Sequence, residues 1–370
     1  MHPDDGTCRS AGQPRPARRG GAGGAEARNT EVLWLVLMTP SRGWEEETMK
    51  YGTLGMIAAA ISLSAAQAMA VELTAAHVNP PGEPSNIAFQ ELAKRLNAGE
   101  TGITLQVFPQ GQIGGETDAL EQVRFGALSM TTVANASLSS FAPSAGVYDL
   151  PYLFRDGDTH PWIVVDGEIG KDIEARIEAE TGMEVLGWWS GGLRHVFTRN
   201  SPVTTPADMS GRKLRVIGSQ VYLDSFNAMG ALATAMPYGE VYTSLATGAI
   251  DGAENDTSGY RNVKFYEQAP NLSLTGHFFL FKPVLANRRE MDRLSPEQRA
   301  EFDRIFAEVT AMQRDLFRSN FESDIEWLKA NGVNVVEVDR TAFAEKVQPV
   351  VEKLSATFGA DLVQRIRDAQ

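Results

Sequence analysis

The sequence predicts an α/β fold in two domains, with a long helix near the C-terminus. Strand-like and helix-like segments alternate from Val71 to Ser137, and the alternation starts again at Lys213. A helical spacing of apolar residues then continues from Ser295 to Gly332. Alternating strands and helices favour mostly parallel sheets that are covered by helices. Two separate runs therefore indicate two α/β domains rather than one long sheet.

The first run contains three expected strands and two expected helices. The strands are expected at 71–78, 103–109 and 129–137, and the helices at 86–96 and 118–128. The segment 103–109 alternates apolar and polar residues, which is typical of a half-buried strand, and the helix at 86–96 has apolar residues three or four apart. This βαβαβ order predicts parallel strands joined by crossover helices.

The second run repeats the same kind of order. Its expected elements are a strand at 213–218, a helix at 219–230, a short strand at 233–237 and a helix at 239–252. Ser219 is a plausible N-cap and Gly230 a plausible stop for the first of these helices.

The long helical segment is predicted to begin with Ser295 as cap and Pro296 in the first turn, and to end at Gly332. At 1.5 Å per residue it would be roughly 50 Å long, which suits a helix that lies across both domains. The alternative is two helices with a break near Ser319 and Asn320. Since neither Pro nor Gly occurs there, one helix is favoured.

An export signal is expected at 49–70. Met49 and Lys50 give a positive start, an apolar stretch follows, and Ala68-Met69-Ala70 has the small-x-small form of a cleavage site. Residues 1–48 are then interpreted as a doubtful upstream extension, because their Gly-, Pro- and Arg-rich part cannot bury enough surface to fold. A genuine disordered leader and an uncleaved anchor remain the alternatives.

Composition restricts the class of protein. Seven basic and seven acidic residues precede Val71, so residues 71–370 keep the net charge of −13. This balance gives no support for nucleic-acid binding, which usually shows a basic stripe. The only cysteine is Cys8, so the exported part would have neither disulfides nor thiol chemistry. We expect a soluble periplasmic protein, cleaved near Ala70 and monomeric.

An enzyme is not expected. The segment Gly187–Gly192 resembles a nucleophile elbow but has the wrong spacing. No phosphate-binding glycine motif occurs, and His77, His160, His195 and His277 do not form a metal-ligand spacing. No cofactor and no metal are therefore predicted.

Three polar residues at strand ends stand out instead. Arg215 lies in the apolar stretch KLRV, Arg194 ends another strand-like run, and Asn255 follows a boundary between helix and strand. Open α/β sheets place their ligands at strand ends. The alternative for Arg215 is an edge strand with its head group in water, or a structural ion pair.

Several motifs resemble the solute-binding proteins of TRAP transporters, the DctP-like family. They are QGQIGGETDALEQVRFGALSM, YDLPYLF, PADMSGRKLRV, MPYGEVYTSLATGAIDGAEN and FYEQAPNLSLTGH, and they occur in the family's order. The resemblance covers essentially all of 71–370. It implies a two-domain periplasmic-binding-protein-like clamp with a long domain-spanning C-terminal helix.

The resemblance also implies roles for individual residues. In that family the arginine that matches Arg215 grips the substrate carboxylate, and a fork of two parallel hydrogen bonds suits that task. The second arginine of the family matches Arg194. Its asparagine matches Asn255, with Glu254 beside it, and its aromatic residue matches Tyr238, which is expected to pack on the carbon skeleton of the ligand.

Further cleft candidates rest on position alone. They are Glu116, Asn135, His77, Asn79 and His277. Glu116 and Asn135 are equally compatible with loop or cap roles, and His277 with a core position. Glu240 is interpreted as a helix N-terminal charge that the dipole favours.

The expected function is a periplasmic solute receptor. Domain I would comprise 71–191 plus about 280–318, and domain II 192–279 plus about 319–370, closing on a small carboxylate by a hinge motion. The resemblance implies delivery to the small and large membrane subunits of a TRAP permease driven by an ion gradient. The alternative is a ligand-sensing partner of a membrane receptor. The ligand is expected to be a sugar acid such as a uronate, or a C4-dicarboxylate, and the polar candidates favour a hydroxylated acid.

Overall fold

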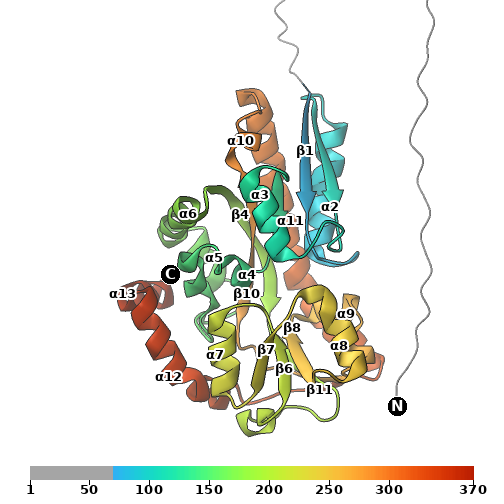
Figure 1. Cartoon of the computed structure of the whole chain (residues 1–370), viewed down its shortest axis with the longest axis vertical. Helices are drawn as coiled ribbons and strands as arrows, with labels where there is room; N and C mark the ends of the chain where they lie inside the picture. Colours follow the sequence, from blue (N-terminus) through green and yellow to red (C-terminus); the bar gives the residue numbers. More distant parts are fainter. Residues whose placement is uncertain (1–69) are drawn as a thin grey trace, which may run out of the picture. The chain divides into compact units, whose positions relative to one another are not determined.

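The computed structural model describes residues 70–370, whose strands form two separate sheets (Figure 1). Apart from Ala70, the predicted leader and signal peptide lie outside these residues. The first sheet has the strand order β2-β1-β3-β10-β4, and the second β11-β9-β5-β8-β6-β7. The strands are β1 (Val71–Ala76), β2 (Ile103–Phe108), β3 (Met130–Thr132), β4 (Met183–Leu193), β5 (His195–Thr198), β6 (Lys213–Val216), β7 (Leu232–Ala235), β8 (Gly252–Asn255), β9 (Asn271–Ser273), β10 (Phe279–Asn287) and β11 (Asn334–Val336).

Helices cover both sheets (Figure 1). The α-helices are α2 (Pro84–Ala98), α3 (Glu116–Phe125), α4 (Asn135–Leu138), α5 (His160–Val165), α6 (Glu168–Thr181), α7 (Gln220–Ala228), α8 (Val241–Thr247), α9 (Thr257–Asn262), α10 (Arg288–Met291), α11 (Pro296–Ala330), α12 (Arg340–Phe358) and α13 (Ala360–Asp368). Short 3₁₀ helices lie at η1 (Pro143–Asp149), η2 (Pro206–Met209), η3 (Tyr238–Glu240) and η4 (Phe265–Glu267). From residue 70 onward, no helix is both long and apolar enough to cross a bilayer.

The predicted parallel pairings are confirmed, but both sheets also contain antiparallel strands. Strand β1 runs parallel to β2 and β3, and β6 runs parallel to β7 and β8. Strand β10 is antiparallel to β3 and β4, and β5 is antiparallel to β8 and β9. All nine residues of β10 are buried, so this strand lacks the alternation that identifies a half-buried strand.

The prediction of a third strand over 129–137 is only partly right. Strand β3 ends at Thr132, and the short helix α4 starts at Asn135. The carboxylate of Glu116 accepts hydrogen bonds from the backbone N–H of Ala134 (2.8 Å) and the hydroxyl of Ser137 (2.5 Å). An acceptor at a helix N-terminus satisfies donors that the helix leaves free. A contact from a neighbouring helix therefore overrides the local strand propensity.

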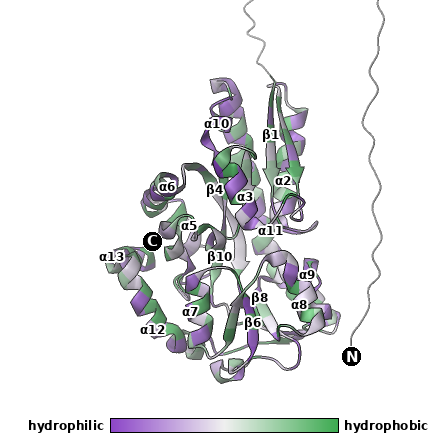
Figure 2. Cartoon of the chain, viewed as in Figure 1, coloured by the Kyte–Doolittle hydropathy of each residue, from purple (hydrophilic) through white to green (hydrophobic). Residues whose placement is uncertain are grey.

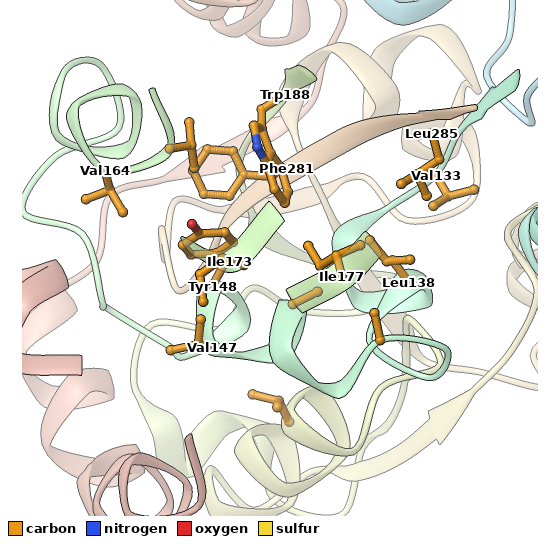
Figure 3. Close-up of a cluster of buried hydrophobic side chains, with 14 of the residues drawn as sticks. Val133, Leu138, Val147, Tyr148, Val164, Ile173, Ile177, Trp188, Phe281 and Leu285 are labelled. Carbon is orange, nitrogen blue, oxygen red and sulfur yellow. The ribbon is translucent and has the colours of Figure 1, made fainter. Parts of the chain in front are cut away.

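Both faces of the first sheet are buried. Successive residues of a strand point to opposite faces, so Trp188 and Trp189 of β4 enter two different cores. Trp188 packs edge-on against Tyr148 (5.3 Å between ring centroids) and near Phe281, as Figure 3 shows. Trp189 packs with Phe306 of α11. A hydrophobic core therefore covers each face of the first sheet.

Helix α11 is one continuous helix, as predicted, and spans both domains (Figure 1). Its 35 residues begin after a capping box formed by Ser295 and Gln298. Phe302 belongs to the core of the first sheet and Leu328 to a core of the second sheet. Between them the fully buried Gln313 accepts from the backbone N–H of Ser190 and donates to its carbonyl, both at 2.8 Å. These contacts fix the helix to β4.

The two C-terminal helices are amphipathic, and the ribbon of α12 carries both green (hydrophobic) and purple (hydrophilic) residues in Figure 2. Phe343 and Val347 of α12 pack in the hydrophobic core that also contains Leu214 of β6, in the second sheet, and Phe226 of α7. Ile366 of α13 joins the core of the first sheet. Amphipathic helices bury their apolar stripe in this way.

Candidate functional site

Polar side chains from both sheets line one cavity, which we call the ligand cavity. From the first sheet's side come residues after β1, at the start of α3 and within β10. From the second sheet come residues of β6 and the end of β8. The polar lining residues are Asn79, Glu83, Glu116, Arg194, Arg215, Tyr238, Asn255, Asp256 and Lys282. Binding sites in open α/β sheets favour such strand ends.

Arg215 is the buried cation of this cavity that has no carboxylate partner. It is 3% exposed, and its Nε and Nη2 atoms donate to the carbonyl of Met236 at 2.9 and 2.7 Å. Its guanidinium lies 5.9 Å from the ring centroid of Tyr238. Within residues 70–370, no carboxylate lies within 4.0 Å of it. Burial lowers the pKa of Arg215, and the carboxylates of Glu254 and Glu116 oppose that effect. An anionic ligand would supply the missing counter-charge.

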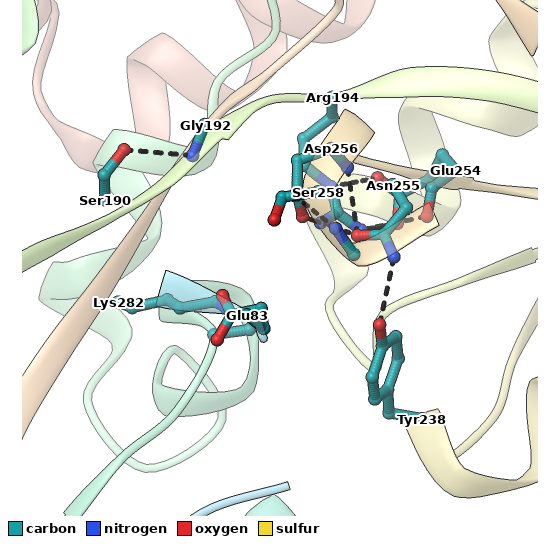
Figure 4. A network of polar contacts seen from close by, with 12 residues as sticks. Glu83, Ser190, Gly192, Arg194, Tyr238, Glu254, Asn255, Asp256, Ser258 and Lys282 are labelled. Carbon is teal, nitrogen blue, oxygen red and sulfur yellow. Dashed lines mark hydrogen bonds and ion pairs between the residues drawn. The ribbon is translucent and has the colours of Figure 1, made fainter. Parts of the chain in front are cut away.

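Arg194, in contrast, is held by a carboxylate of the protein. It lies between β4 and β5, and its Nε and Nη2 atoms donate to the two carboxylate oxygens of Glu254 at 2.6 and 3.0 Å. Figure 4 shows this pair next to Asn255 and Asp256. Burial acts to raise the pKa of Glu254, but the charge of Arg194 and the hydrogen bonds from His277 and Arg194 together lower that pKa to about 2. The pair orders this end of the cavity.

Asn255 connects Arg194 to Tyr238. Its Oδ1 atom accepts from Nη1 of Arg194, and its Nδ2 atom donates to the Tyr238 hydroxyl at 3.1 Å (Figure 4). Because both amide atoms are in use, the orientation of Asn255 is fixed. Burial raises the pKa of Tyr238, so its hydroxyl keeps its proton and remains a donor at neutral pH.

The first sheet contributes a buried ion pair at the opposite side of the network. Nζ of Lys282, in β10, donates to Oε1 of Glu83 at 2.6 Å, and Figure 4 shows the two side chains together. Glu83 is also the N-cap of α2, where it accepts from the backbone N–H groups of Ser85 and Asn86. Burial raises the pKa of Glu83, and Lys282 opposes that effect.

Six of the ten predicted residues line the ligand cavity, and four do not. The six are Arg215, Arg194, Asn255, Tyr238, Asn79 and Glu116. Glu254 lies behind Arg194 as its ion-pair partner. Asn135 points away, donating to the Ala145 carbonyl and to Asp149. His277 bonds with Thr275 and lies 3.8 Å from Glu254.

His77 is the fourth residue outside the lining. Its Nδ1 atom accepts from the backbone N–H of Asn79 at 3.1 Å, and its ring stacks on Phe89 at 5.3 Å. Burial, with a smaller effect from Lys282, lowers the pKa of His77 to about 3. The neutral ring accepts this hydrogen bond and so orients the loop after β1. His77 therefore positions Asn79 without lining the cavity itself.

Sequence reasoning missed Glu83, Lys282 and Asp256 of the lining. Lys282 had a usable signal, since a lysine within the apolar run FLFKPVLA needs a buried partner. Its partner Glu83 is 199 residues away, which no local pattern reveals.

A second, larger cavity lies beside the middle of α11. Its lining includes Trp162, Arg314, Phe317 and Phe321. Arg314 already has partners within the protein there: its guanidinium lies 4.0 Å from the Trp162 ring centroid and forms an ion pair with Asp166. None of the ten predicted residues lines this cavity, and no group of acidic and histidine side chains in residues 70–370 could hold a metal ion.

Two α/β sheets, a helix across both and a polar cavity with buried arginines define a two-domain solute-binding protein. Residues 75–357 match the family model described as "Bacterial extracellular solute-binding protein, family 7", DctP. The chain belongs to this family, the periplasmic solute-binding proteins of TRAP transporters, which bind solutes for transport and catalyse no reaction.

Relatives and solved structures agree with this assignment. The 2,3-diketo-L-gulonate-binding periplasmic protein YiaO of Escherichia coli is 32% identical, over 76% of this chain and 86% of its own. The C4-dicarboxylate-binding periplasmic protein DctP of Rhodobacter capsulatus is 29% identical, over 85% and 96%. A TRAP solute-binding protein of Pseudomonas putida F1, solved with bound D-glucuronate, is 34% identical, with a TM-score of 0.77 over 81% of this chain and 98% of that one.

Proposed function

We propose that this protein binds a small organic acid anion in the ligand cavity and delivers it to the small and large membrane subunits of a TRAP permease. The observation that carries the proposal is the state of Arg215. It is buried, it lines the cavity, and within residues 70–370 it forms no ion pair with a carboxylate. A buried charge without a counter-charge is unfavourable, and a ligand carboxylate would pair with its guanidinium through two hydrogen bonds.

The surroundings of Arg215 support a defined orientation of the acid. Arg194 cannot be the main counter-charge, because Glu254 already neutralises it. Beside Arg194, the amide of Asn255 donates a hydrogen bond to the Tyr238 hydroxyl. We therefore assign the carboxylate group to Arg215, with Arg194, Asn255 and Tyr238 as further contacts.

Two ligand classes are candidates for this site. A sugar acid such as a uronate is supported by the D-glucuronate-bound and 2,3-diketo-L-gulonate-binding relatives. A C4-dicarboxylate is supported by the C4-dicarboxylate-binding relative. The polar lining favours the sugar acid, because buried polar groups need partners that hydroxyl groups provide.

We also propose that the two sheets with their helices are domains that close on the ligand. The chain crosses between the sheets at Arg194 and at His277, where the backbone N–H of Arg194 donates to the carbonyl of Phe278 (2.8 Å) and that of His277 to the carbonyl of Arg194 (3.2 Å). Two adjacent crossings suit a hinge. Small-angle scattering should show a more compact protein with ligand, and an identical profile at saturation would contradict closure.

A thermal-shift screen of organic acids tests the proposed function. A ligand that binds only the folded state raises the melting temperature by mass action. D-Glucuronate or another acid should raise it, whereas the uncharged amide of the same compound, such as D-glucuronamide, should not. Equal shifts by an acid and its amide would show that the cavity does not recognise a carboxylate.

A further inference from the structure

The first-sheet side of the ligand cavity contains an unused polar side chain, Asn79. Its residue is only 6% exposed, and it lines the cavity. Within residues 70–370 the structure gives its amide group no hydrogen-bond partner, since only its backbone N–H is bonded, to His77. An unbonded amide that lines a cavity can both donate and accept, so Asn79 offers both a donor and an acceptor to a ligand.

Lys282 offers a donor to the same cavity. Its ammonium group has three N–H donors, of which one is taken by Glu83 at 2.6 Å and another faces the Ser85 hydroxyl at the long distance of 3.5 Å. Glu83 itself has no free acceptor, because its two oxygens already take four hydrogen bonds. Glu83 therefore positions Lys282 and cancels its charge.

Glu116 supplies the uncompensated negative charge of this side. Each of its carboxylate oxygens accepts one hydrogen bond, from Ala134 and from Ser137, which leaves an acceptor site on each. It forms no ion pair within residues 70–370. The charges of Glu83 and Lys282 cancel, so the net charge that this side presents to a ligand comes from Glu116.

We propose that Asn79, Lys282 and Glu116 form a hydroxyl-recognition wall, and that Glu116 makes the cavity prefer an acid with one carboxylate and several hydroxyl groups over a dicarboxylate of the same carbon skeleton. This inference rests on the proposed function, since it requires the carboxylate at Arg215. A hydroxyl group can donate to Glu116 and accept from Lys282 or Asn79. A second carboxylate has no proton to donate and meets the like charge of Glu116.

Two pairs of sugar acids test the wall directly by calorimetric titration of the purified protein. D-Galactonate and galactarate differ only in a terminal CH₂OH or carboxylate group, and D-gluconate and D-glucarate form a second pair. The one-carboxylate acid of at least one pair should bind about tenfold or more tightly than its dicarboxylate. Glu116→Gln should reduce that ratio by about fivefold or more, because the amide keeps the shape of the side chain without its charge.

A matched control removes the same charge from the same helix. Glu121 is exposed on α3 and does not line the cavity, so Glu121→Gln should leave the ratio unchanged. Asn79→Ala should weaken binding of the preferred acid roughly tenfold, since it removes hydrogen bonds to the ligand. It should leave the melting temperature of the ligand-free protein unchanged, because this amide forms no hydrogen bond within residues 70–370.

The outcomes separate the wall from the proposed function. If the dicarboxylates or succinate bind as tightly as the one-carboxylate acids, or if Glu116→Gln and Glu121→Gln change the ratio equally, the inference is wrong while the carboxylate site stands. If no carboxylic acid binds the unmodified protein, the proposed function itself fails.

Discussion

Arg194 and Arg215 should respond differently to truncation in the absence of ligand. Both are buried, but Arg194 forms a two-point ion pair with Glu254, which is 1% exposed, whereas among residues 70–370 Arg215 bonds to one carbonyl alone. Arg194→Ala would leave the Glu254 carboxylate buried without a counter-charge. Arg215→Ala removes a cation whose burial is itself unfavourable. We therefore expect Arg194→Ala to destabilise the protein and Arg215→Ala to change its stability little.

The magnitude follows from the environment of the pair. Removing one partner of a buried ion pair typically costs about 3–5 kcal/mol of unfolding free energy. For the roughly 300 residues of the described part, 70–370, the unfolding entropy is roughly 0.6 kcal/mol per degree, so Arg194→Ala should lower the melting temperature by about 5–8 °C. Arg215→Ala should change it by less than about 2 °C.

Thermal unfolding of the ligand-free variants is the assay, and Glu254→Gln provides the rescue. Adding Glu254→Gln to Arg194→Ala should recover more than half of the lost stability, because the uncompensated charge is gone. A melting temperature of Arg194→Ala within 2 °C of the parent would refute the structural role of the pair. So would a double variant that is less stable than Arg194→Ala alone.

The pH dependence gives an independent check on the same pair. In the folded protein the pKa of Glu254 is lowered to about 2, below its ordinary value of 4.5. Its contribution to stability is therefore present above pH 4.5 and is lost as the pH falls towards 2. Without Arg194, burial acts to raise the pKa of Glu254 and only His277 still opposes it among the residues that lower it in the parent. The stability gap between the parent and Arg194→Ala should therefore narrow below pH 5.

Three further predictions concern buried positions. Burial raises the pKa of Asp149, which accepts a hydrogen bond from Asn135, to about 8. As the pH rises from roughly 4 to 8, the unfolding free energy of the parent, measured by urea titration, should therefore fall by about 1.4 kcal/mol per pH unit relative to that of Asp149→Asn. Parallel pH profiles of the two proteins would contradict this. Gln313→Ala leaves a buried N–H and carbonyl of β4 unpaired and should cost about 2–4 kcal/mol by the same assay, whereas a loss below 1 kcal/mol would show that the contact is dispensable. Gly192→Ala introduces a Cβ atom at φ +71°, 3.3 Å from the Phe317 ring, and should cost about 1–3 kcal/mol, so an unchanged melting temperature would show that the turn relaxes.

Local patterns predicted the elements whose signals are contained in a short stretch of sequence. The capping residues and the 3–4 spacing gave α11, with Ser295 as its N-cap, as observed. Period-2 alternation gave β2 to within one residue. Strand β10 was missed because its residues are buried on both faces. The helix at Asn135 was missed because a carboxylate from α3 caps it.

The site was predictable where residue type and strand position coincide. Arg215, Arg194 and Asn255 stood at strand ends, and the structure brings them to one cavity. The different states of the two arginines were not predictable, because the pairing of Arg194 with Glu254 depends on the strand order of the second sheet. Lys282 depends in the same way on a partner from the other end of the chain.

Calorimetric titration of Arg215 variants with an acid that binds the parent is the most direct test of the carboxylate site. Losing one partner of a buried charged pair costs about 2–5 kcal/mol, so Arg215→Ala should weaken binding roughly 30-fold to several thousand-fold at 1.36 kcal/mol per factor of ten. Arg215→Lys should also bind poorly, since a point charge cannot reproduce the two-point contact. Binding by a folded Arg215→Ala protein within about threefold of the parent would show that Arg215 does not hold the carboxylate, which must then bind elsewhere.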